Sequence, residues 1–188
     1  MNINFSMYPI TDTIRKAEIE LLNLIKAEAA DLLPATEIVT NEEDLHKYTN
    51  LEMSISTGTL LLGQTCGYPL HNFYFDQLNV VAVPKYNSDG CQDETYSSVI
   101  ISNRADFKMT ECSRIAINSK CSMSGNLLLE WFAGPNQFER TYTGSHRASI
   151  QMISEGKADV AAIDCHTFSL LHQNFPDIMS GVHIIGYT

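Results

Sequence analysis

Apolar residues along the chain follow two different periods, one typical of strands and the other typical of helices. Short apolar or alternating runs indicate strands at residues 3–8, 36–40, 58–64, 79–84, 95–102, 114–118, 159–164 and 182–187. Helical spacing lies between them, at residues 11–33, 125–134, 146–155 and 168–175. Strands that alternate with helices predict an α/β fold built of mainly parallel sheets flanked by helices.

Two segments of the first half carry detailed expectations. Residues 11–33 predict a long helix, and one of its faces carries Ile14, Ala17, Leu21, Leu24 and Ile25. Residues 79–84, "NVVAVP", form an uninterrupted apolar run, which is typical of a strand buried on both faces. We therefore expect residues 79–84 to lie in one sheet with strands 3–8 and 60–64.

A polar stretch without periodicity, "KYNSDGCQDE" at residues 85–94, interrupts this alternation. It is rich in turn-forming residues. We therefore expect a boundary between two lobes near residues 84–95.

The composition indicates a soluble globular protein, since 44% of the 188 residues are hydrophobic and 18% are charged. The net charge is −10, and the basic residues are scattered, so a nucleic-acid or anionic-membrane partner is not expected. The N-terminal residues show no basic region followed by an apolar one, and no apolar run is long enough to span a membrane.

The five cysteines are odd in number and lack any C-x-x-C pair, which signals neither a disulfide framework nor a zinc site. We expect them to be buried, reduced thiols: Cys66, Cys91, Cys112, Cys121 and Cys165. No metal or cofactor is expected.

Hydroxyl-rich turns follow two of the predicted strands and precede helices. Ser122 and Ser124 follow the strand at 114–118, and Thr143, Ser145 and His146 precede the helix at 146–155. Such helix starts offer hydroxyls and free backbone N–H groups to an anion. Ser124 and Ser145 can also be ordinary N-caps, which leaves two interpretations open.

Asp164 directly follows the apolar run "VAAI" and is therefore expected at the edge of a sheet. A carboxylate there needs a partner, either a ligand or nearby backbone N–H groups.

Catalytic signatures are missing, including the P-loop, G-x-G-x-x-G, H-E-x-x-H and G-x-S-x-G patterns. A nucleophilic pair of Cys66 with His71 or His146 is conceivable, but no base lies at a diagnostic spacing from Cys66.

Six segments, in order, resemble the substrate-binding components of phosphate/phosphonate-type ABC transporters. The segments are "LLLGQTCGYPL", "PKYNSDGC", "ETYSSVI", "AINSKCSMSGN", "TGSHRASI" and "GKADVAAIDC". The resemblance implies the two-lobed fold of type II periplasmic binding proteins. Residues 1–86 would form lobe 1 and residues 87–181 lobe 2, with residues 182–188 returning to lobe 1.

The resemblance also implies the site. The oxyanion would be held by Ser122, Ser124 and the backbone of Met123, and by Ser145 and His146 with Thr143 beside them. Tyrosines and an acidic group would contact the rest of the ligand, at Tyr8, Tyr96 and Asp164.

The function expected from these features is a non-enzymatic receptor for phosphate, phosphite or an organophosphonate, serving an ABC permease. The alternatives are a cytoplasmic ligand sensor and a hydrolase or transferase using Cys66 or His146. The resemblance implies a periplasmic location, whereas a natural start at Met1 would imply a cytoplasmic one. It also implies a further C-terminal segment covering lobe 1. Without that segment we expect an apolar face there, and either a homodimer through lobe 1 or poor stability.

Overall fold

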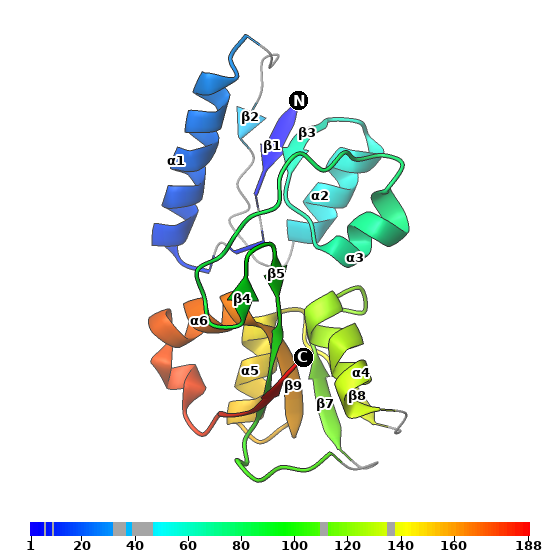
Figure 1. Cartoon of the computed structure of the whole chain (residues 1–188), viewed down its shortest axis with the longest axis vertical. Coiled ribbons are helices and arrows are strands. Elements are labelled where there is room, and N and C mark those ends of the chain that lie inside the picture. Colours follow the sequence, from blue (N-terminus) through cyan, green and yellow to red (C-terminus); the bar gives the residue numbers. More distant parts are fainter. Residues whose placement is uncertain (6, 9, 32–36, 39–46, 110–112, 135–137) are drawn as a thin grey trace. The chain divides into compact units, whose positions relative to one another are not determined.

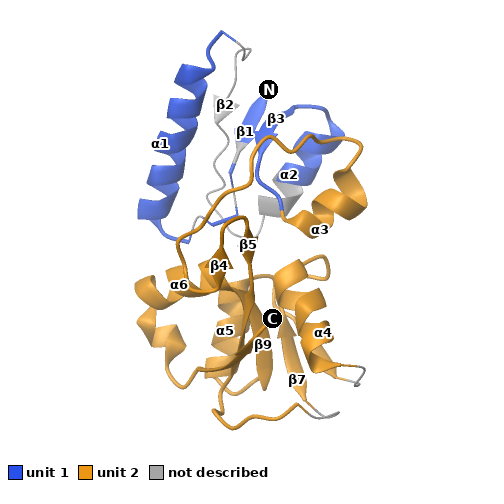
Figure 2. Ribbon diagram, viewed as in Figure 1, with its two compact units in different colours: residues 1–65 blue, residues 66–188 orange. Residues whose placement is uncertain are grey.

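The computed structural model describes residues 1–5, 7–8, 10–31, 37–38, 47–109, 113–134 and 138–188 (Figure 1). The chain divides into two compact units, Met1–Thr65 and Cys66–Thr188 (Figure 2). This division differs from the expected boundary near residue 86. The assignment of residues 1–86 and 87–181 to two lobes stays a prediction.

The first unit contains a parallel sheet of three strands in the order β2-β1-β3. The strands are β1 (Asn2–Asn4), β2 (Glu37–Ile38) and β3 (Leu60–Gly63). Helices α1 (Asp12–Glu28) and α2 (Lys47–Ser56) connect them. Thr11 caps α1, because its hydroxyl accepts a hydrogen bond from the N–H of Ile14 at 3.2 Å. The apolar core of this unit includes Ile3, Leu22, Leu51 and Ile55.

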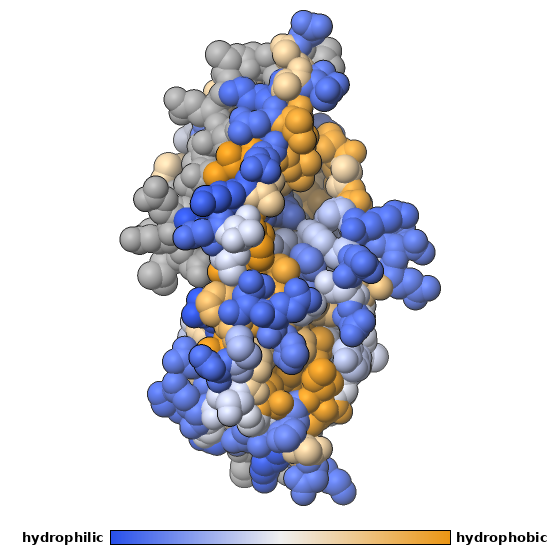
Figure 3. All heavy atoms as spheres, turned by 90° about the vertical axis from the view of Figure 1, so that its left-hand side faces the viewer, coloured by the Kyte–Doolittle hydropathy of each residue, from blue (hydrophilic) through white to orange (hydrophobic). Residues whose placement is uncertain are grey.

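The buried face of α1 is only partly the predicted one. Leu22 is its buried residue, whereas Ala17, Leu21 and Leu24 are exposed, Leu24 by 64%. Figure 3 views this side of the molecule and shows hydrophobic spheres among hydrophilic ones over α1. Ile14 and Ile25 of the predicted face are half-buried, so the burial of α1 is shifted toward Leu22.

The second unit is built on a sheet of five strands in the order β10-β6-β9-β7-β8. The strands are β6 (Ser98–Ser102), β7 (Arg114–Ile117), β8 (Glu139–Tyr142), β9 (Val160–Asp164) and β10 (His183–Tyr187). β7 is parallel to β8 and β9, while β6 is antiparallel to β9 and β10. The α/β prediction is confirmed, but this sheet is mixed rather than mainly parallel.

Helical segments flank this sheet or precede it in the chain. They are α3 (Gly67–Pro69), η2 (Leu70–Tyr74), η3 (Met123–Leu127), α4 (Leu128–Ala133), α5 (His146–Ser154), α6 (Cys165–Asn174) and η4 (Pro176–Met179). A small hairpin of β4 (Cys91–Gln92) and β5 (Thr95–Tyr96) leads into β6. None of the helices in the described ranges combines the length and the apolar character needed to cross a membrane.

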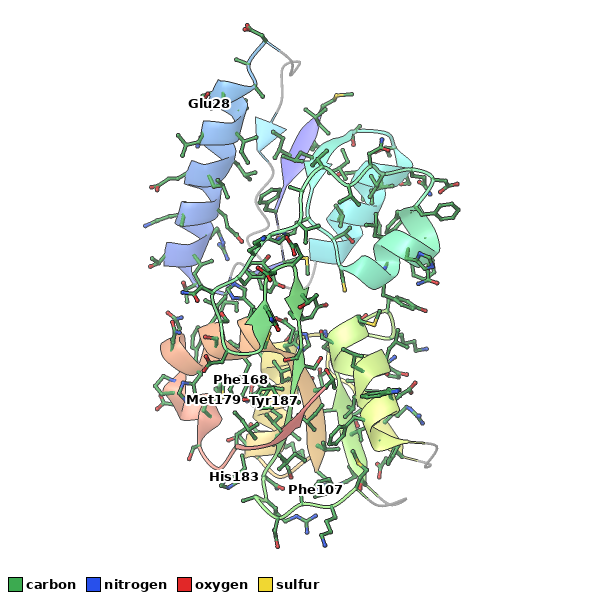
Figure 4. All side chains as sticks on the ribbon, in the orientation of Figure 1. Glu28, Phe107, Phe168, Met179, His183 and Tyr187 are labelled. Atoms are coloured by element: carbon green, nitrogen blue, oxygen red, sulfur yellow. The ribbon has the colours of Figure 1, made fainter. Side chains whose placement is uncertain are left out.

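The core of the second unit forms because every residue of β6 and β9 is buried. Ile100, Ile115 and Leu129 belong to its central cluster. Phe107, labelled in Figure 4, packs on this cluster from the loop that follows β6. The paired strands therefore form a rigid base for the loops at their ends.

Strand β10 corrects the expectation that residues 182–188 return to lobe 1. His183 pairs with Ser102 and Tyr187 with Val99, so β10 is an edge strand of the five-stranded sheet. Figure 4 labels both ends of this strand, His183 and Tyr187.

The expectation for residues 79–84 is also wrong. This segment forms no strand, and Val80, Val81 and Val83 are exposed, Val81 by 77%. The reason is that no strand of the described ranges pairs with it. An apolar run without a hydrogen-bonded neighbour cannot be buried inside a sheet.

An ion pair joins β7 to the turn before β9. The Arg114 guanidinium contacts both carboxylate oxygens of Asp159, at 2.7 and 3.2 Å, and the Arg114 N–H donates to the same carboxylate at 2.7 Å. These hydrogen bonds hold the pKa of the Asp159 carboxyl below its usual range. The ionised form of Asp159 therefore stabilises the fold.

We predict that Asp159→Asn lowers the free energy of unfolding by about 1–2 kcal/mol at neutral pH, because Arg114 loses its charged partner. The pKa of Asp159 is lower in the folded than in the unfolded state, so this contribution is present above about pH 4 and is lost as the pH falls through the folded pKa. Thermal unfolding of both proteins from neutral to acidic pH measures the difference. Glu130→Gln, which breaks a more exposed pair with Arg140, is the control and should cost under about 0.5 kcal/mol. A variant as stable as the wild type at neutral pH would contradict the prediction.

Candidate anion-binding site

The turn after β7 places two serines at the start of η3. Ser122 is the N-cap, and its hydroxyl accepts a hydrogen bond from the N–H of Gly125 at 3.0 Å. Ser124 lies inside the first turn, is only 4% exposed, and has its Oγ 3.5 Å from that of Ser122. The cap is thus Ser122 and not Ser124. Met123 is the first residue of η3, where a backbone N–H has no partner inside the helix.

The turn after β8 caps the start of α5. Ser145 is the N-cap, one of the two interpretations that the sequence left open, because its hydroxyl accepts from the N–H of Ala148 at 3.1 Å. The Thr143 hydroxyl lies 2.7 Å from that of Ser149 and 3.0 Å from the carbonyl oxygen of Ser145. Thr143 therefore holds the turn in place, and His146 becomes the first residue of the helix.

Asp164 ends β9 and caps α6. Its Oδ1 accepts from the N–H of Thr167 at 2.8 Å, and its Oδ2 accepts from the Thr167 hydroxyl. The carboxylate is buried, so these bonds compensate part of its lost hydration. The predicted alternative, an acceptor for nearby backbone N–H groups, is therefore present in the structure.

These three turns meet at the imidazole of His146. Its Nε2 lies 3.3 Å from Ser124 Oγ, 3.3 Å from Asn118 Nδ2 and 3.5 Å from Asp164 Oδ2. We call Ser122, Ser124, His146 and Asp164, together with Asn118, the polar cluster. The sequence predicted four of its members, and the structure brings them together from three separate loops.

The arrangement at His146 differs from a nucleophilic triad. In a Ser-His-Asp triad the serine and the aspartate use opposite ring nitrogens. Here Ser124 and Asp164 both lie at Nε2. Because one nitrogen either donates or accepts, His146 can serve Asp164 as a donor or Ser124 as an acceptor. The cluster thus keeps hydrogen-bonding capacity for a ligand.

The close packing of the cluster depends on Gly125. A Cβ atom at this position would lie 2.0 Å from Asn118 Oδ1 and 2.9 Å from His146 Cε1. A residue without a side chain is required for η3 to approach both groups.

Tyr96 lies at the end of β5, two residues before the Ser98 that pairs with Asp164. Its side chain is 39% exposed, and its hydroxyl lies 3.9 Å from the Cys66 thiol. Burial of the phenol, followed by the nearby Cys66 and Asp164, raises the Tyr96 pKa. Tyr8 is a buried residue of the first unit, so its part in a shared site stays a prediction.

The cysteines are less buried than expected. Of the four in the described ranges only Cys165 is buried, and Cys66, Cys91 and Cys121 are partly exposed. Cys112 lies outside the described residues. The Cys66 thiol contacts the Tyr96 hydroxyl, and a nucleophilic pair of Cys66 with His71 or His146 stays a prediction. No group of three or more metal-binding side chains occurs in the part of the chain that the structure describes.

Sequence reasoning missed Asn118 and Gly125. Asn118 follows the last residue of β7, so its place at the carboxyl end of a strand was a usable signal. Gly125 gave no comparable signal, because its role depends on two side chains that are distant in sequence.

Residues 45–188 match the family model described as ABC transporter, phosphonate, periplasmic substrate-binding protein. Since this match covers more than half of the chain, the protein belongs to this family of substrate-binding proteins. Comparison with curated proteins found no matching sequence.

Similar solved structures support the same fold. PhnD1 from Prochlorococcus marinus (MIT 9301), in complex with methylphosphonate, has a TM-score of 0.70 and 18% identity, with 100% of this chain and 72% of that chain covered. A binding protein component of an ABC phosphonate transporter from Pseudomonas aeruginosa has a TM-score of 0.69 and 13% identity, with coverage of 100% and 64%. The periplasmic aliphatic sulphonate binding protein SsuA from Escherichia coli has a TM-score of 0.59 and 18% identity, with coverage of 100% and 56%. These are binding proteins, and they confirm the type II periplasmic binding protein fold.

We predict that Gly125→Ala destabilises the second unit by about 1–3 kcal/mol, because the new methyl group displaces Asn118 or His146. Urea unfolding measures the loss, and NMR of the His146 ring reports its displacement. Gly67→Ala is the matched control, since a Cβ there would meet no atom within 4 Å. An unchanged stability and an unmoved His146 ring in Gly125→Ala would disprove this account of the packing.

Proposed function

We propose that the protein is the receptor of an ABC-type uptake system for a small phosphorus oxyanion: phosphate, phosphite or an organophosphonate. The observation that supports this most is the convergence of two helix starts on the polar cluster, in a chain of the phosphonate-binding family. The phosphonate-binding titles of two similar structures agree with this ligand class.

The helix starts supply donors that carry no full charge. Ser122 and Ser145 each use a hydroxyl oxygen to accept from their own helix, so the hydroxyl proton remains for a ligand. The N-termini of η3 and α5 add partial positive charge. Such dipoles can hold an oxyanion without an arginine, so the net charge of −10 is no obstacle.

Asp164 would serve as the acceptor. A phosphonate monoanion carries one P–OH group, and a buried carboxylate accepts a hydrogen bond from it. A sulphonate has the same shape but no proton, so it would meet Asp164 as a like charge. Asp164 therefore favours phosphonate over sulphonate.

We expect methylphosphonate at 100 times its Kd to raise the midpoint of thermal unfolding by about 5–10 °C, which corresponds to a stabilisation of about 2.7 kcal/mol.

Ser124→Ala and His146→Ala should each weaken binding about 10- to 150-fold, since each removes a hydrogen bond to a charged group. Isothermal titration with phosphate, phosphite, methylphosphonate and aminoethylphosphonate gives the affinities.

Ser169→Ala and His183→Ala are the matched controls for these variants. Ser169 bonds to Gln173 on the surface of α6, and His183 is exposed on β10. Both should bind as the wild type does. No binding of any phosphorus oxyanion by a chain that includes the full length of its relatives would refute the proposal, and unchanged affinities in Ser124→Ala and His146→Ala would place the ligand elsewhere.

We predict that Asp164→Asn changes selectivity rather than abolishing binding. Asparagine also caps helices well, so α6 should keep its start. The preference for methylphosphonate over methanesulphonate should fall at least about 10-fold, because the amide no longer repels the sulphonate and accepts more weakly from P–OH. Competition titrations at a pH where the phosphonate is monoanionic measure this ratio. The exposed Asp106→Asn is the control, and an unchanged ratio in Asp164→Asn would exclude Asp164 from the site.

The partners and location belong to the same proposal. The receptor would act in the periplasm and deliver its ligand to a membrane permease. Tyr8 and Tyr96 would contact the part of the ligand that lies away from the oxyanion.

The exposed Leu21 and Leu24 on α1 support a homodimer through the first unit. A non-enzymatic role agrees with the imidazole geometry, in which Ser124 and Asp164 share Nε2 instead of using opposite ring nitrogens as in a Ser-His-Asp triad.

A further inference from the structure

Two thiols that the proposed ligand site does not use lie in contact with each other. Cys91 belongs to β4, and Cys165 is the first residue of α6. Their sulfur atoms are 3.2 Å apart, although the residues are separated by 74 positions in the sequence. The fold of the second unit therefore creates a dithiol pair that the spacing of the cysteines did not reveal.

Contacts between residues 86–91 and the start of α6 hold this pair of thiols in place. The ring of Tyr86 stacks on that of His166, with centroids 4.0 Å apart, and the Ser88 hydroxyl lies 2.9 Å from His166 Nδ1. His166 directly follows Cys165. Residues 86–91 are thus fixed on the start of α6 independently of the thiols.

Backbone hydrogen bonds complete this attachment. The N–H of Cys165 donates to the carbonyl of Ser97 at 3.1 Å, and the N–H of Ser97 donates to the carbonyl of Gly90 at 2.9 Å. Gly90 has a φ of +89°, and a Cβ there would lie 2.9 Å from the Cβ of Cys165. Glycine at this position therefore lets Cys91 approach Cys165.

We propose that Cys91 and Cys165 form a disulfide by exchange with an external disulfide, either a small one such as glutathione disulfide or that of a thiol oxidase. Cys91 is partly exposed, so its thiolate attacks the external disulfide, forms a mixed disulfide and releases one thiol. The thiol of Cys165 then loses its proton to solvent and attacks the Cys91 sulfur, which releases the second thiol. Two protein thiols are oxidised, and one external disulfide is reduced to two thiols.

The order of these steps follows from the surroundings of the two sulfurs. Burial, and then the contact with Cys91, raises the pKa of the Cys165 thiol to about 12, which makes it a poor first nucleophile. Once Cys91 carries the mixed disulfide, the second attack is intramolecular and occurs at a sulfur already in contact. Cys165 is therefore the resolving thiol.

The test uses the full chain with all five cysteines, first reduced and then incubated with glutathione disulfide. After alkylation of free thiols and digestion without reductant, mass spectrometry should find the peptides of Cys91 and Cys165 joined with the loss of two hydrogen atoms. The midpoint of thermal unfolding should rise by about 5–10 °C, because the bond closes a long loop, and dithiothreitol should reverse the rise.

Cys91→Ser and Cys165→Ser should each abolish the joined peptide and the shift, whereas Cys121→Ser, a partly exposed cysteine of the same unit, should keep both. If Cys165→Ser does not fold, Cys91→Ser alone decides, since its side chain is not in the core. A lasting glutathione adduct on Cys91, a bond from Cys91 to another cysteine, or two fully alkylated thiols after oxidation would overturn the proposal.

Discussion

The antiparallel pairing of β6 with β9 is the constraint on which the polar cluster depends. Ser98 pairs with Asp164, so the register of two buried strands fixes where the carboxylate stands. The Ser98 hydroxyl also donates to the carbonyl of Ser124 at 3.0 Å, which ties the start of η3 to the same strand. One strand residue thus positions two groups from different loops. A register shift of one residue would move both and would turn Ser98 to the other face of the sheet.

Local chemistry explains what the sequence could predict. Helix starts are encoded by a few adjacent residues, so Ser145 as a candidate cap and the place of Asp164 at the end of a strand followed from short patterns. The burial of one face of a helix or strand is harder to predict, because it depends on which other elements pack against that face. The exposed Leu24 on α1 and the exposed Val81 show that an apolar pattern is necessary for burial but does not supply the partner.

Contacts between distant residues account for what the sequence could not predict. Asn118 and His146 are 28 positions apart, and Cys91 and Cys165 are 74 apart. Neither pair has a local signature, and both depend on a glycine that permits close approach, Gly125 and Gly90. The family resemblance placed Ser122, Ser124 and His146 in one site, and the structure shows that these residues are neighbours. The shared use of His146 Nε2 became visible only with the geometry.

The position of β10 has a mechanical consequence. β10 runs antiparallel along β6, and the N–H of Ser98 donates to the hydroxyl of Thr188 just beyond it, at 2.9 Å. Tension applied along the backbone of β10 loads this ladder in shear, so its hydrogen bonds resist together rather than opening one after another. Ser98 would move with the pulled strand and would take Asp164 and the backbone of Ser124 with it. Strand β10 is therefore a path by which a force on this edge of the sheet reaches Ser98, the residue that pairs with Asp164 and bonds to Ser124.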